Sequence, residues 1–313
     1  MKNLYVSRYC YFFRSTTGVP LAYSSKANSF IELSDYVFEL LKVHQTEEKP
    51  INEIVPSEVL ETLCKEGFVG FKESDDNFVL ESQFVTQTVQ HDTTKLNLVL
   101  VPTLNCNFDC PYCFENGKRG GIMSEDTIKD LLEFIKGNKG KDNMSLTWYG
   151  GEPLLGLKVI DKILKGLDKI GCTLKHHSII SNGYYFDEKA MEIFESHPLD
   201  SIQITLDGQE DRHNKLRAMK STKAPSFNTI LQHIKLIAEN MPQTELHVRV
   251  NIDKNNVEDY FSLREDINNM VNSNNVIVYP GIIRLENKEM TNTVEPAFGR
   301  WETANFLYDI YSK

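Results

Sequence analysis

The chain has few cysteines, no long apolar run and no excess of positive charge. Six cysteines among 313 residues are too few for a disulfide-stabilised scaffold. The N-terminus, MKNLYVSRYCYFF, lacks the apolar run of a signal peptide, and no stretch of about 18 apolar residues occurs anywhere in the sequence. We therefore expect a cytoplasmic protein that does not attach to a membrane. In that reducing compartment, closely spaced cysteines more often bind metal than form disulfides.

The charge balance narrows the classes of partner. The sequence has 34 Lys and Arg against 44 Asp and Glu, a formal net charge of −10. Such a surface is not attracted to nucleic acid or to anionic lipid. A composition of 41% hydrophobic and 25% charged residues is that of a globular protein. We expect the substrate to be a small molecule, a peptide or a protein.

The first part of the chain has the pattern of a small α+β winged helix-turn-helix domain, residues 1–84, followed by a polar linker, residues 85–95. Its elements are predicted as strands at 9–13, 20–23 and 29–33, helices at 34–41 and 56–67, and a closing two-stranded hairpin at 68–80.

Charge argues against DNA as the ligand of this domain. Residues 1–90 contain 8 Lys and Arg against 13 Asp and Glu. The helix expected to lie on DNA, residues 56–67, carries three glutamates and one lysine. A peptide-binding role and a purely structural role, in which the domain packs on the larger one, both remain open at this point.

The second part, residues 96–313, alternates strands and helices. Strands are predicted at 96–101, 145–149, 175–180, 201–206, 245–250 and 275–280, and helices at 125–136, 157–169, 187–195, 227–240, 257–270 and from 297 to the end. Six β/α units imply a parallel sheet. A complete eight-unit barrel needs about 250 residues, so we expect an open, partial (β/α)6 barrel.

Unusual residues follow the predicted strands. The segment TLNCNFDCPYCF (103–114) follows the first strand, GGEP (150–153) the second, SNG (181–183) the third and LDG (206–208) the fourth, while Asn251 ends the fifth. The carboxyl ends of parallel strands lie at one edge of the sheet, where such folds assemble their active sites. We therefore expect one site at this edge.

The segment 103–114 contains three cysteines, Cys106, Cys110 and Cys113. A structural zinc site needs four ligands, yet no histidine lies between His91 and His176. Three thiolates on one loop instead suit an iron-sulfur cubane in which the fourth iron has no protein ligand and is open to another molecule. A zinc-stabilised α/β protein is the alternative.

The spacing C-x3-C-x2-C with an aromatic residue, Tyr112, before the last cysteine resembles the signature of radical S-adenosylmethionine (radical SAM) enzymes. The resemblance covers about residues 95–313 and implies the same partial (β/α)6 barrel. It also implies a [4Fe-4S] cluster held by the three cysteines, with S-adenosylmethionine bound to the open iron.

The resemblance implies further cofactor-binding residues. The segment Gly150, Gly151, Glu152 and Pro153 is similar to the glycine-rich segment whose backbone receives the methionyl ammonium group, assisted by Glu152. The remaining implied contacts are Ser181 and Asn182 to the ribose, Arg217 to the carboxylate, Asn251 to the nucleoside and the Tyr112 backbone to the adenine. For Asp207 two roles stay open, facing the substrate or capping a turn.

The barrel motifs together with the N-terminal domain resemble the SPASM-type peptide and protein maturases. This implies that residues 1–84 bind the leader of a ribosomally made precursor peptide as an added strand, and that a flavodoxin or ferredoxin supplies one electron. Crosslinking, thioether formation and epimerisation of the peptide all remain possible. The alternatives are an anaerobic sulfatase maturase and a non-catalytic leader-peptide adaptor.

The sequence departs from that family in one respect. Many such maturases have a cysteine-rich C-terminal region that binds auxiliary iron-sulfur clusters, whereas no cysteine follows Cys172. We expect that the sequence is a fragment that stops before such a region; the alternative is an enzyme that works with one cluster.

Overall fold

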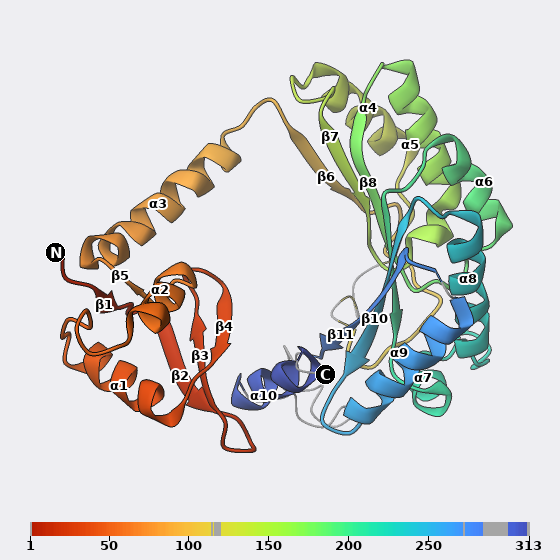
Figure 1. Cartoon of the computed structure of the whole chain (residues 1–313). Helices are drawn as coiled ribbons and strands as arrows, with labels where there is room; N and C mark the ends of the chain where they lie inside the picture. Colours follow the sequence, from red (N-terminus) through yellow and green to blue (C-terminus); the bar gives the residue numbers. More distant parts are fainter. Residues whose placement is uncertain (1, 114, 116–119, 272, 284–299, 312–313) are drawn as a thin grey trace. The chain divides into compact units, whose positions relative to one another are not determined.

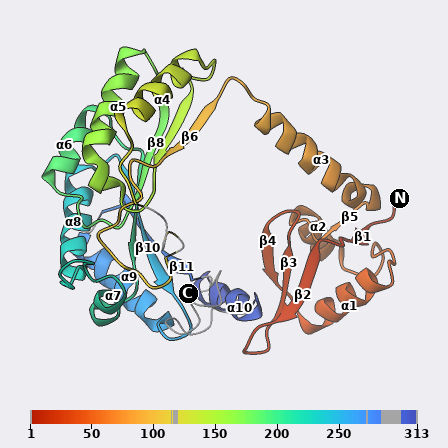
Figure 2. The ribbon, with the colours of Figure 1, turned by 180° about the vertical axis from the view of Figure 1, so that it is seen from behind.

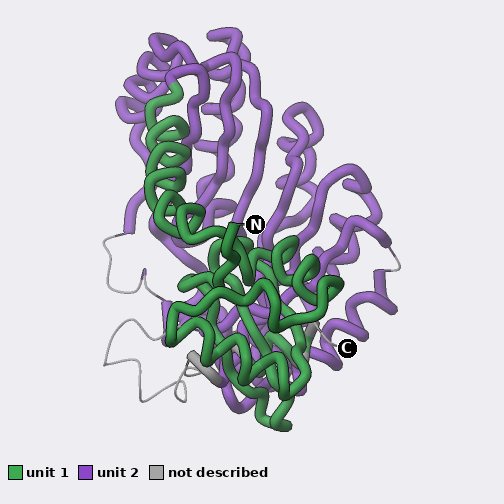
Figure 3. Tube along the Cα trace, turned by 60° about the vertical axis from the view of Figure 1, so that its left-hand side comes forward, with its two compact units in different colours: residues 1–92, 304–313 green, residues 93–303 purple. Residues whose placement is uncertain are grey.

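The computed structural model describes residues 2–113, 115, 120–271, 273–283 and 300–311. The chain forms two compact units, one of residues 1–92 with 304–313 and one of residues 93–303 (Figure 3). Among the described residues, no helix combines the length and the apolar character that crossing a membrane requires.

The first unit contains a three-stranded antiparallel sheet in the order β2-β3-β4, and β1 pairs with β5 (Figure 1). The elements are β1 Tyr5–Val6, β2 Cys10–Arg14, β3 Pro20–Ser24, β4 Ser29–Glu32, α1 Asp35–Thr46, α2 Ser57–Lys65, β5 Val69–Gly70 and α3 Lys72–Gln90. Its core contains Ala22, Leu41, Ile51, Leu63 and Phe68, each at most 1% exposed.

The hairpin predicted at 68–80 is wrong beyond Gly70, because residues 72–90 form the helix α3. Residues 85–90 of the predicted linker are consequently helical. The acidic run that resembles a turn places Asp75 in the first helical turn, where negative charge favours a helix. Tertiary contacts then hold the helix start: the Asp75 carboxylate accepts hydrogen bonds from the Ser7 hydroxyl and the Arg8 N–H, both at 2.9 Å.

The second unit is built on six parallel strands in the order β11-β10-β9-β8-β7-β6 (Figures 1 and 2). The strands are β6 Leu96–Leu100, β7 Met144–Trp148, β8 Leu174–Ser181, β9 Ser201–Leu206, β10 Glu245–Ile252 and β11 Val276–Ile282. The predicted α/β fold with a six-stranded parallel sheet is confirmed.

The helices of this unit are α4 Glu125–Gly137, α5 Leu157–Lys169, α6 Glu188–Ser196, α7 Glu210–Leu216, α8 Phe227–Asn240 and α9 Val257–Val271, with the 3-10 turn η1 Pro153–Gly156. Helix α10, Arg300–Tyr311, lies within the last predicted helix, whose residues 297–299 and 312–313 are outside the described part. Helices α4, α5, α6, α8 and α9 lie on the same face of the sheet (Figures 1 and 2), as right-handed crossovers require. Side-chain N-caps mark the start of two of these helices: Ser124 caps α4 and Asp187 caps α6.

The two faces of the sheet differ in chemistry. Residues under the helices, such as Leu146, Ile202 and Val248, are fully buried. Their strand neighbours on the opposite face, Thr147, Gln203 and Arg249, are polar and only half-buried. A parallel sheet buried on both faces would be apolar throughout, so the face opposite the helices is suited to contact a polar ligand.

The helix-covered face contains one buried polar pair. The Trp148 indole N–H donates to His177 Nε2 at 2.7 Å, and His177 Nδ1 lies 3.2 Å from the Pro198 carbonyl oxygen. Since Nε2 accepts, the ring proton is on Nδ1 and the imidazole is neutral. Burial lowers the pKa of His177 to about 4.

Acidification is expected to destabilise the protein through His177. Unfolding restores a pKa of about 6.5, so the stability that depends on the neutral ring is present above that pH and is lost as the pH falls toward 4. Between pH 7 and pH 5 the loss is about 2 kcal/mol. Free energies of unfolding measured at pH 7, 6 and 5 should therefore fall less steeply in His177→Gln than in the unchanged chain. His176→Gln, which alters the exposed neighbour in the same strand, is the control, and an equal flattening in both variants would contradict this assignment.

Candidate active site

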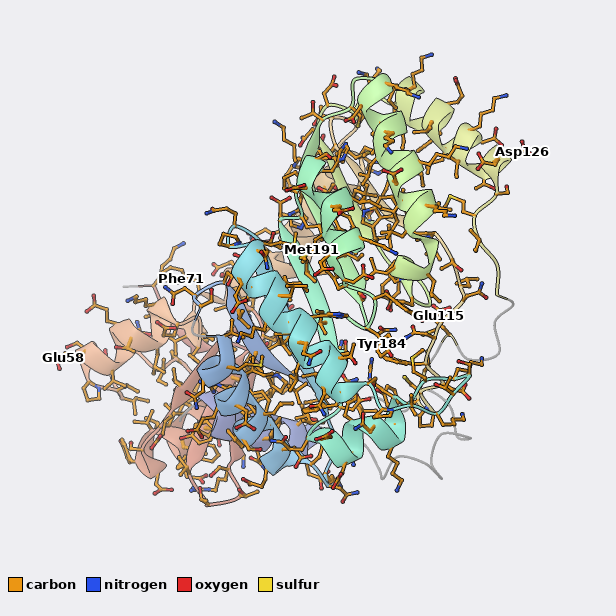
Figure 4. All side chains as sticks on the ribbon, turned by 90° about the vertical axis from the view of Figure 1, so that its right-hand side faces the viewer. Glu58, Phe71, Glu115, Asp126, Tyr184 and Met191 are labelled. Carbon is orange, nitrogen blue, oxygen red and sulfur yellow. The ribbon has the colours of Figure 1, made fainter. Side chains whose placement is uncertain are left out.

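The three cysteines lie on the loop between β6 and α4, and each thiol is half-buried and free. Backbone groups shape the loop: the Cys113 N–H donates to the Cys110 carbonyl at 3.1 Å, and the Phe108 N–H donates to the Cys106 sulfur at 3.4 Å. Phe108 is buried and packs edge-on against Tyr184, which follows β8. Figure 4 labels Glu115 of this loop and Tyr184.

The Gly150–Gly151 pair makes room for the cysteine loop. Gly150 has φ +127°, and a Cβ there would lie 2.5 Å from the Thr103 carbonyl oxygen; a Cβ on Gly151 would lie 2.4 Å from the Asn105 carbonyl oxygen. The Gly151 N–H donates to Thr103 at 3.2 Å, and the Glu152 N–H donates to Asn105 at 2.8 Å. A side chain at either position would collide with the backbone of the cysteine loop, so the chain's own loop requires glycine here; the predicted approach of the methionyl ammonium group to this segment stays a prediction.

Glu152 is fully buried and connects the ends of β7 and β8. Its carboxylate accepts hydrogen bonds from the Ser181 hydroxyl at 2.8 Å, the Asn182 N–H at 2.7 Å and the Leu154 N–H at 3.1 Å. Burial raises the pKa of Glu152, and these hydrogen bonds oppose the rise. Pro153 follows as the buried first residue of η1.

Asn182 extends this connection to the cysteine loop. Its side-chain N–H2 group donates to the Asn107 side-chain oxygen at 2.8 Å and lies 3.9 Å from the Cys106 sulfur. Glu152, Ser181 and Asn182 therefore form one hydrogen-bonded group beside Cys106.

Asp207, at the end of β9, is the centre of a second group. Its carboxylate accepts hydrogen bonds from the Tyr112 hydroxyl, from Arg217 Nε at 2.7 Å and from the Asn251 amide at 2.9 Å. Asp207 is fully buried and Arg217 is 8% exposed. Burial is the largest influence and by itself would raise the pKa of Asp207, but the Arg217 charge and the hydrogen bonds from Tyr112 and Arg217 together lower it.

The buried His213 supports the Asp207–Arg217 pair through hydrogen bonds that lead to the backbone of both residues. The Asp207 N–H donates to His213 Nδ1 at 3.3 Å, and His213 Nε2 lies 3.0 Å from the Ser226 hydroxyl, which itself donates to the Arg217 carbonyl. Nε2 must therefore carry the proton. Burial, together with the nearby Arg217 charge, lowers the pKa of His213 to about 3, so the ring stays neutral.

All twelve residues predicted for the site lie at this edge of the sheet, in the two groups and the cysteine loop. Sequence reasoning missed the connecting residues Asn107 and His213 and left the role of Asp207 open. The only available signal for His213 was its position four residues before Arg217 in HNKLR, which a helical turn brings together.

The three thiols suit an iron-sulfur cluster by their chemistry, although in the described part of the chain no three His, Cys, Asp or Glu side chains are gathered closely enough to hold a metal ion. Burial raises the pKa of Cys110 to about 12, an effect that Arg217 opposes, and burial also raises the pKa of Cys106. These thiols are therefore protonated without a metal, and iron would replace the protons and compensate the buried thiolates. Three thiolates ligate three irons and leave one open.

Comparison with known proteins agrees with this geometry. The model of the radical SAM superfamily matches residues 100–267, more than half of the chain. A cysteine-type anaerobic sulfatase-maturating enzyme of Clostridium novyi is 26% identical over 171 residues, 51% of this chain and 44% of that protein. The radical SAM cyclopropyl synthase TigE of Paramaledivibacter caminithermalis is 22% identical over 213 residues, 55% of this chain and 44% of that protein. The chain spans about half the length of the curated relatives it matches.

Two solved structures share the fold. Native anSMEcpe with bound AdoMet and Cp18Cys peptide superposes with a TM-score of 0.57 and 17% identity, covering 70% of this chain and 59% of that chain. Streptococcus suis SuiB bound to S-adenosylmethionine superposes with a TM-score of 0.51 and 14% identity, and the match covers 98% of this chain and 70% of that chain. Members of the matched family carry a [4Fe-4S] cluster and bind S-adenosylmethionine, so both predicted cofactors are confirmed. Its sequence match and its six-stranded sheet both place the chain in one family: it belongs to the radical SAM superfamily.

Proposed function

We propose that this chain modifies a ribosomally made precursor peptide by radical chemistry, forming a crosslink or a thioether or epimerising a residue. When bound, the cluster and S-adenosylmethionine supply a 5′-deoxyadenosyl radical that removes a hydrogen atom from the substrate. The observation that carries the proposal is the convergence of the residues around Glu152 and Asp207 on the three-cysteine loop.

The residues of the chain would hold these cofactors as follows. Cys106, Cys110 and Cys113 would each bind one iron. The backbone of Gly150–Pro153 and the side chains of Ser181 and Asn182 would orient the aminoacyl and ribose parts of the cosubstrate. Arg217, Asn251 and the Tyr112 backbone would complete its carboxylate, nucleoside and adenine contacts.

The first unit supports a peptide as the substrate. Strand β4 is an edge of the three-stranded sheet, so backbone groups on its outer side can pair with an added strand. Phe30 on this strand is 42% exposed, and Tyr11 on the other edge strand is 56% exposed, which offers apolar contacts to a leader. The acidic balance of residues 1–90 suits a peptide better than DNA.

Anaerobic reconstitution tests the radical chemistry. We expect about four irons per chain and release of 5′-deoxyadenosine from S-adenosylmethionine when a one-electron donor, ferredoxin or flavodoxin, is supplied. Failure of both would refute the proposal.

The precursor tests the substrate. A short peptide encoded beside the gene should bind the full chain and change mass on incubation, and backbone N-methylation of its leader should abolish binding if the leader pairs with β4. A change of mass in a sulfatase, with none in the precursor, would instead support the sulfatase-maturase function of the Clostridium novyi relative. Binding without any turnover would support an adaptor.

A further inference from the structure

Arg249 of β10 lies on the face of the sheet opposite the helices, and three neighbours define its position. Its register partners are Thr205 on β9 and Tyr279 on β11. Its Nε donates to the Asn251 side-chain oxygen at 3.0 Å. The Tyr279 hydroxyl of β11 donates to the Gln203 side-chain oxygen of β9 at 2.7 Å. Because β10 lies between these two strands, the hydrogen bond crosses β10 and fixes the position of the phenol.

Gly281 leaves the space that the Arg249 side chain occupies. A Cβ on Gly281 would lie 2.1 Å from Arg249 Nε and 2.9 Å from its Cζ. The guanidinium therefore lies across β11 where only glycine fits, and its position is set by packing as well as by the hydrogen bond to Asn251.

The charge of Arg249 is not balanced by a carboxylate in the described part of the chain, where no Asp or Glu oxygen lies within 4.0 Å of it. By contrast, Arg217 is paired with Asp207, and Arg212 with Asp253 at 2.5 Å. An arginine held in this way on a half-buried polar face is suited to bind a carboxylate through two parallel hydrogen bonds.

Arg249 adjoins the proposed cofactor-binding residues through Asn251. Asn251 bridges the two, since its amide contacts Asp207 at 2.9 Å and lies 3.4 Å from the Tyr112 hydroxyl, while its oxygen accepts from Arg249. Burial raises the pKa of Tyr149 and of Tyr279, and the nearby charge of Arg249 opposes both rises.

We propose that Arg249 binds a carboxylate of the peptide substrate, an Asp or Glu side chain or the C-terminus, and so holds the reacting residue next to the cofactor site. The proposal rests on the proposed function, because it concerns the peptide on which the radical acts. The same chemistry is also present in the methionyl carboxylate of S-adenosylmethionine, and the experiment must separate these two sources.

The test is binding to the reconstituted full chain, saturated with S-adenosylmethionine and without reductant. The probe is a pentapeptide library in two matched forms, one with Asp, Glu and free C-termini and one with Asn, Gln and amidated C-termini. The unchanged chain should retain the acidic form about 10-fold more strongly, since a charge-assisted hydrogen bond contributes roughly 1.5–3 kcal/mol. Arg249→Met should lose this preference, and Gly281→Ala, which displaces the guanidinium without removing it, should lose most of it. Arg264→Met, on the exposed surface of α9, should keep it.

A second measurement identifies the source of the carboxylate. Arg249→Met removes the hydrogen bond to Asn251, a proposed nucleoside contact, so it should change the affinities for S-adenosylmethionine and for its decarboxylated analogue by the same factor. A loss of affinity for S-adenosylmethionine alone would assign Arg249 to the cosubstrate and overturn the proposal, as would equal or absent retention of the two peptide forms by the unchanged chain. Since neither measurement needs turnover, a failure here is distinct from a failure to release 5′-deoxyadenosine, which would overturn the proposed function instead.

Discussion

Cys110→Ala is expected to abolish the release of 5′-deoxyadenosine and to reduce the iron content well below four per chain. Cys110 is one of only three thiols on the loop, so its loss leaves two protein ligands for a cubane that already has one open iron. Iron analysis, the absorbance of the reconstituted protein and chromatography of the reaction products measure the effect. The variant should still bind the precursor peptide, because residues 1–92 belong, with 304–313, to a compact unit that does not contain the loop.

The matched control is Cys64→Ala, which removes an exposed thiol of α2 far from the loop in the sequence. It should retain about four irons and full release of 5′-deoxyadenosine. Unchanged turnover in Cys110→Ala, or an equal loss in both variants, would refute the assignment of the cluster to the loop.

Asp207→Ala is expected to destabilise the fold by about 3–5 kcal/mol, the cost of leaving a buried charge without its partner. Arg217 would keep its charge at 8% exposure, and the hydroxyl of Tyr112 and the amide of Asn251 would each lose an acceptor. Because all three residues are proposed contacts of S-adenosylmethionine, Tyr112 through its backbone, the affinity for S-adenosylmethionine should fall as well. Denaturant unfolding and equilibrium binding of S-adenosylmethionine measure the two effects.

A second variant separates stability from cofactor binding. The double substitution Asp207→Leu and Arg217→Met removes both charges and should recover much of the stability, but it should not recover affinity for S-adenosylmethionine. Asp211→Asn, an exposed carboxylate four residues further along, is the control and should alter neither quantity. Recovery of affinity in the double variant would show that Arg217 does not contact the cosubstrate.

Local patterns predicted the barrel well because its elements follow from local chemistry. Alternating buried and half-buried residues mark strands such as β7 and β9, and caps such as Ser124 mark the start of a helix. Since the strands run parallel, their carboxyl ends lie at one edge of the sheet. The site location therefore followed from the order of the elements, without knowledge of any side-chain contact.

The prediction at α3 was wrong because this helix does not follow from local chemistry. Residues 72–80 contain a Ser-Asp-Asp-Asn run typical of a turn. Helix α3 buries none of its residues, so no apolar face at helical spacing was needed for packing, and such a face is what would indicate a helix in the sequence. What holds it is contact with distant residues: Asp75 with Ser7 and Arg8, and Phe78 with Tyr9 at a ring separation of 4.8 Å. A local pattern carries no information about such partners.

The sequence by itself determined the chemistry of the site: three closely spaced thiols, a Gly-Gly segment and polar residues at consecutive strand ends. Only the tertiary structure decided which of these residues depend on one another. Asp207 gathers Tyr112, Arg217 and Asn251 from sequence separations of 95, 10 and 44 residues, and Gly281 makes room for Arg249 from the neighbouring strand. The physical reason is that hydrogen bonding and packing at a buried centre depend on distances in space, which the order of residues along the chain does not specify.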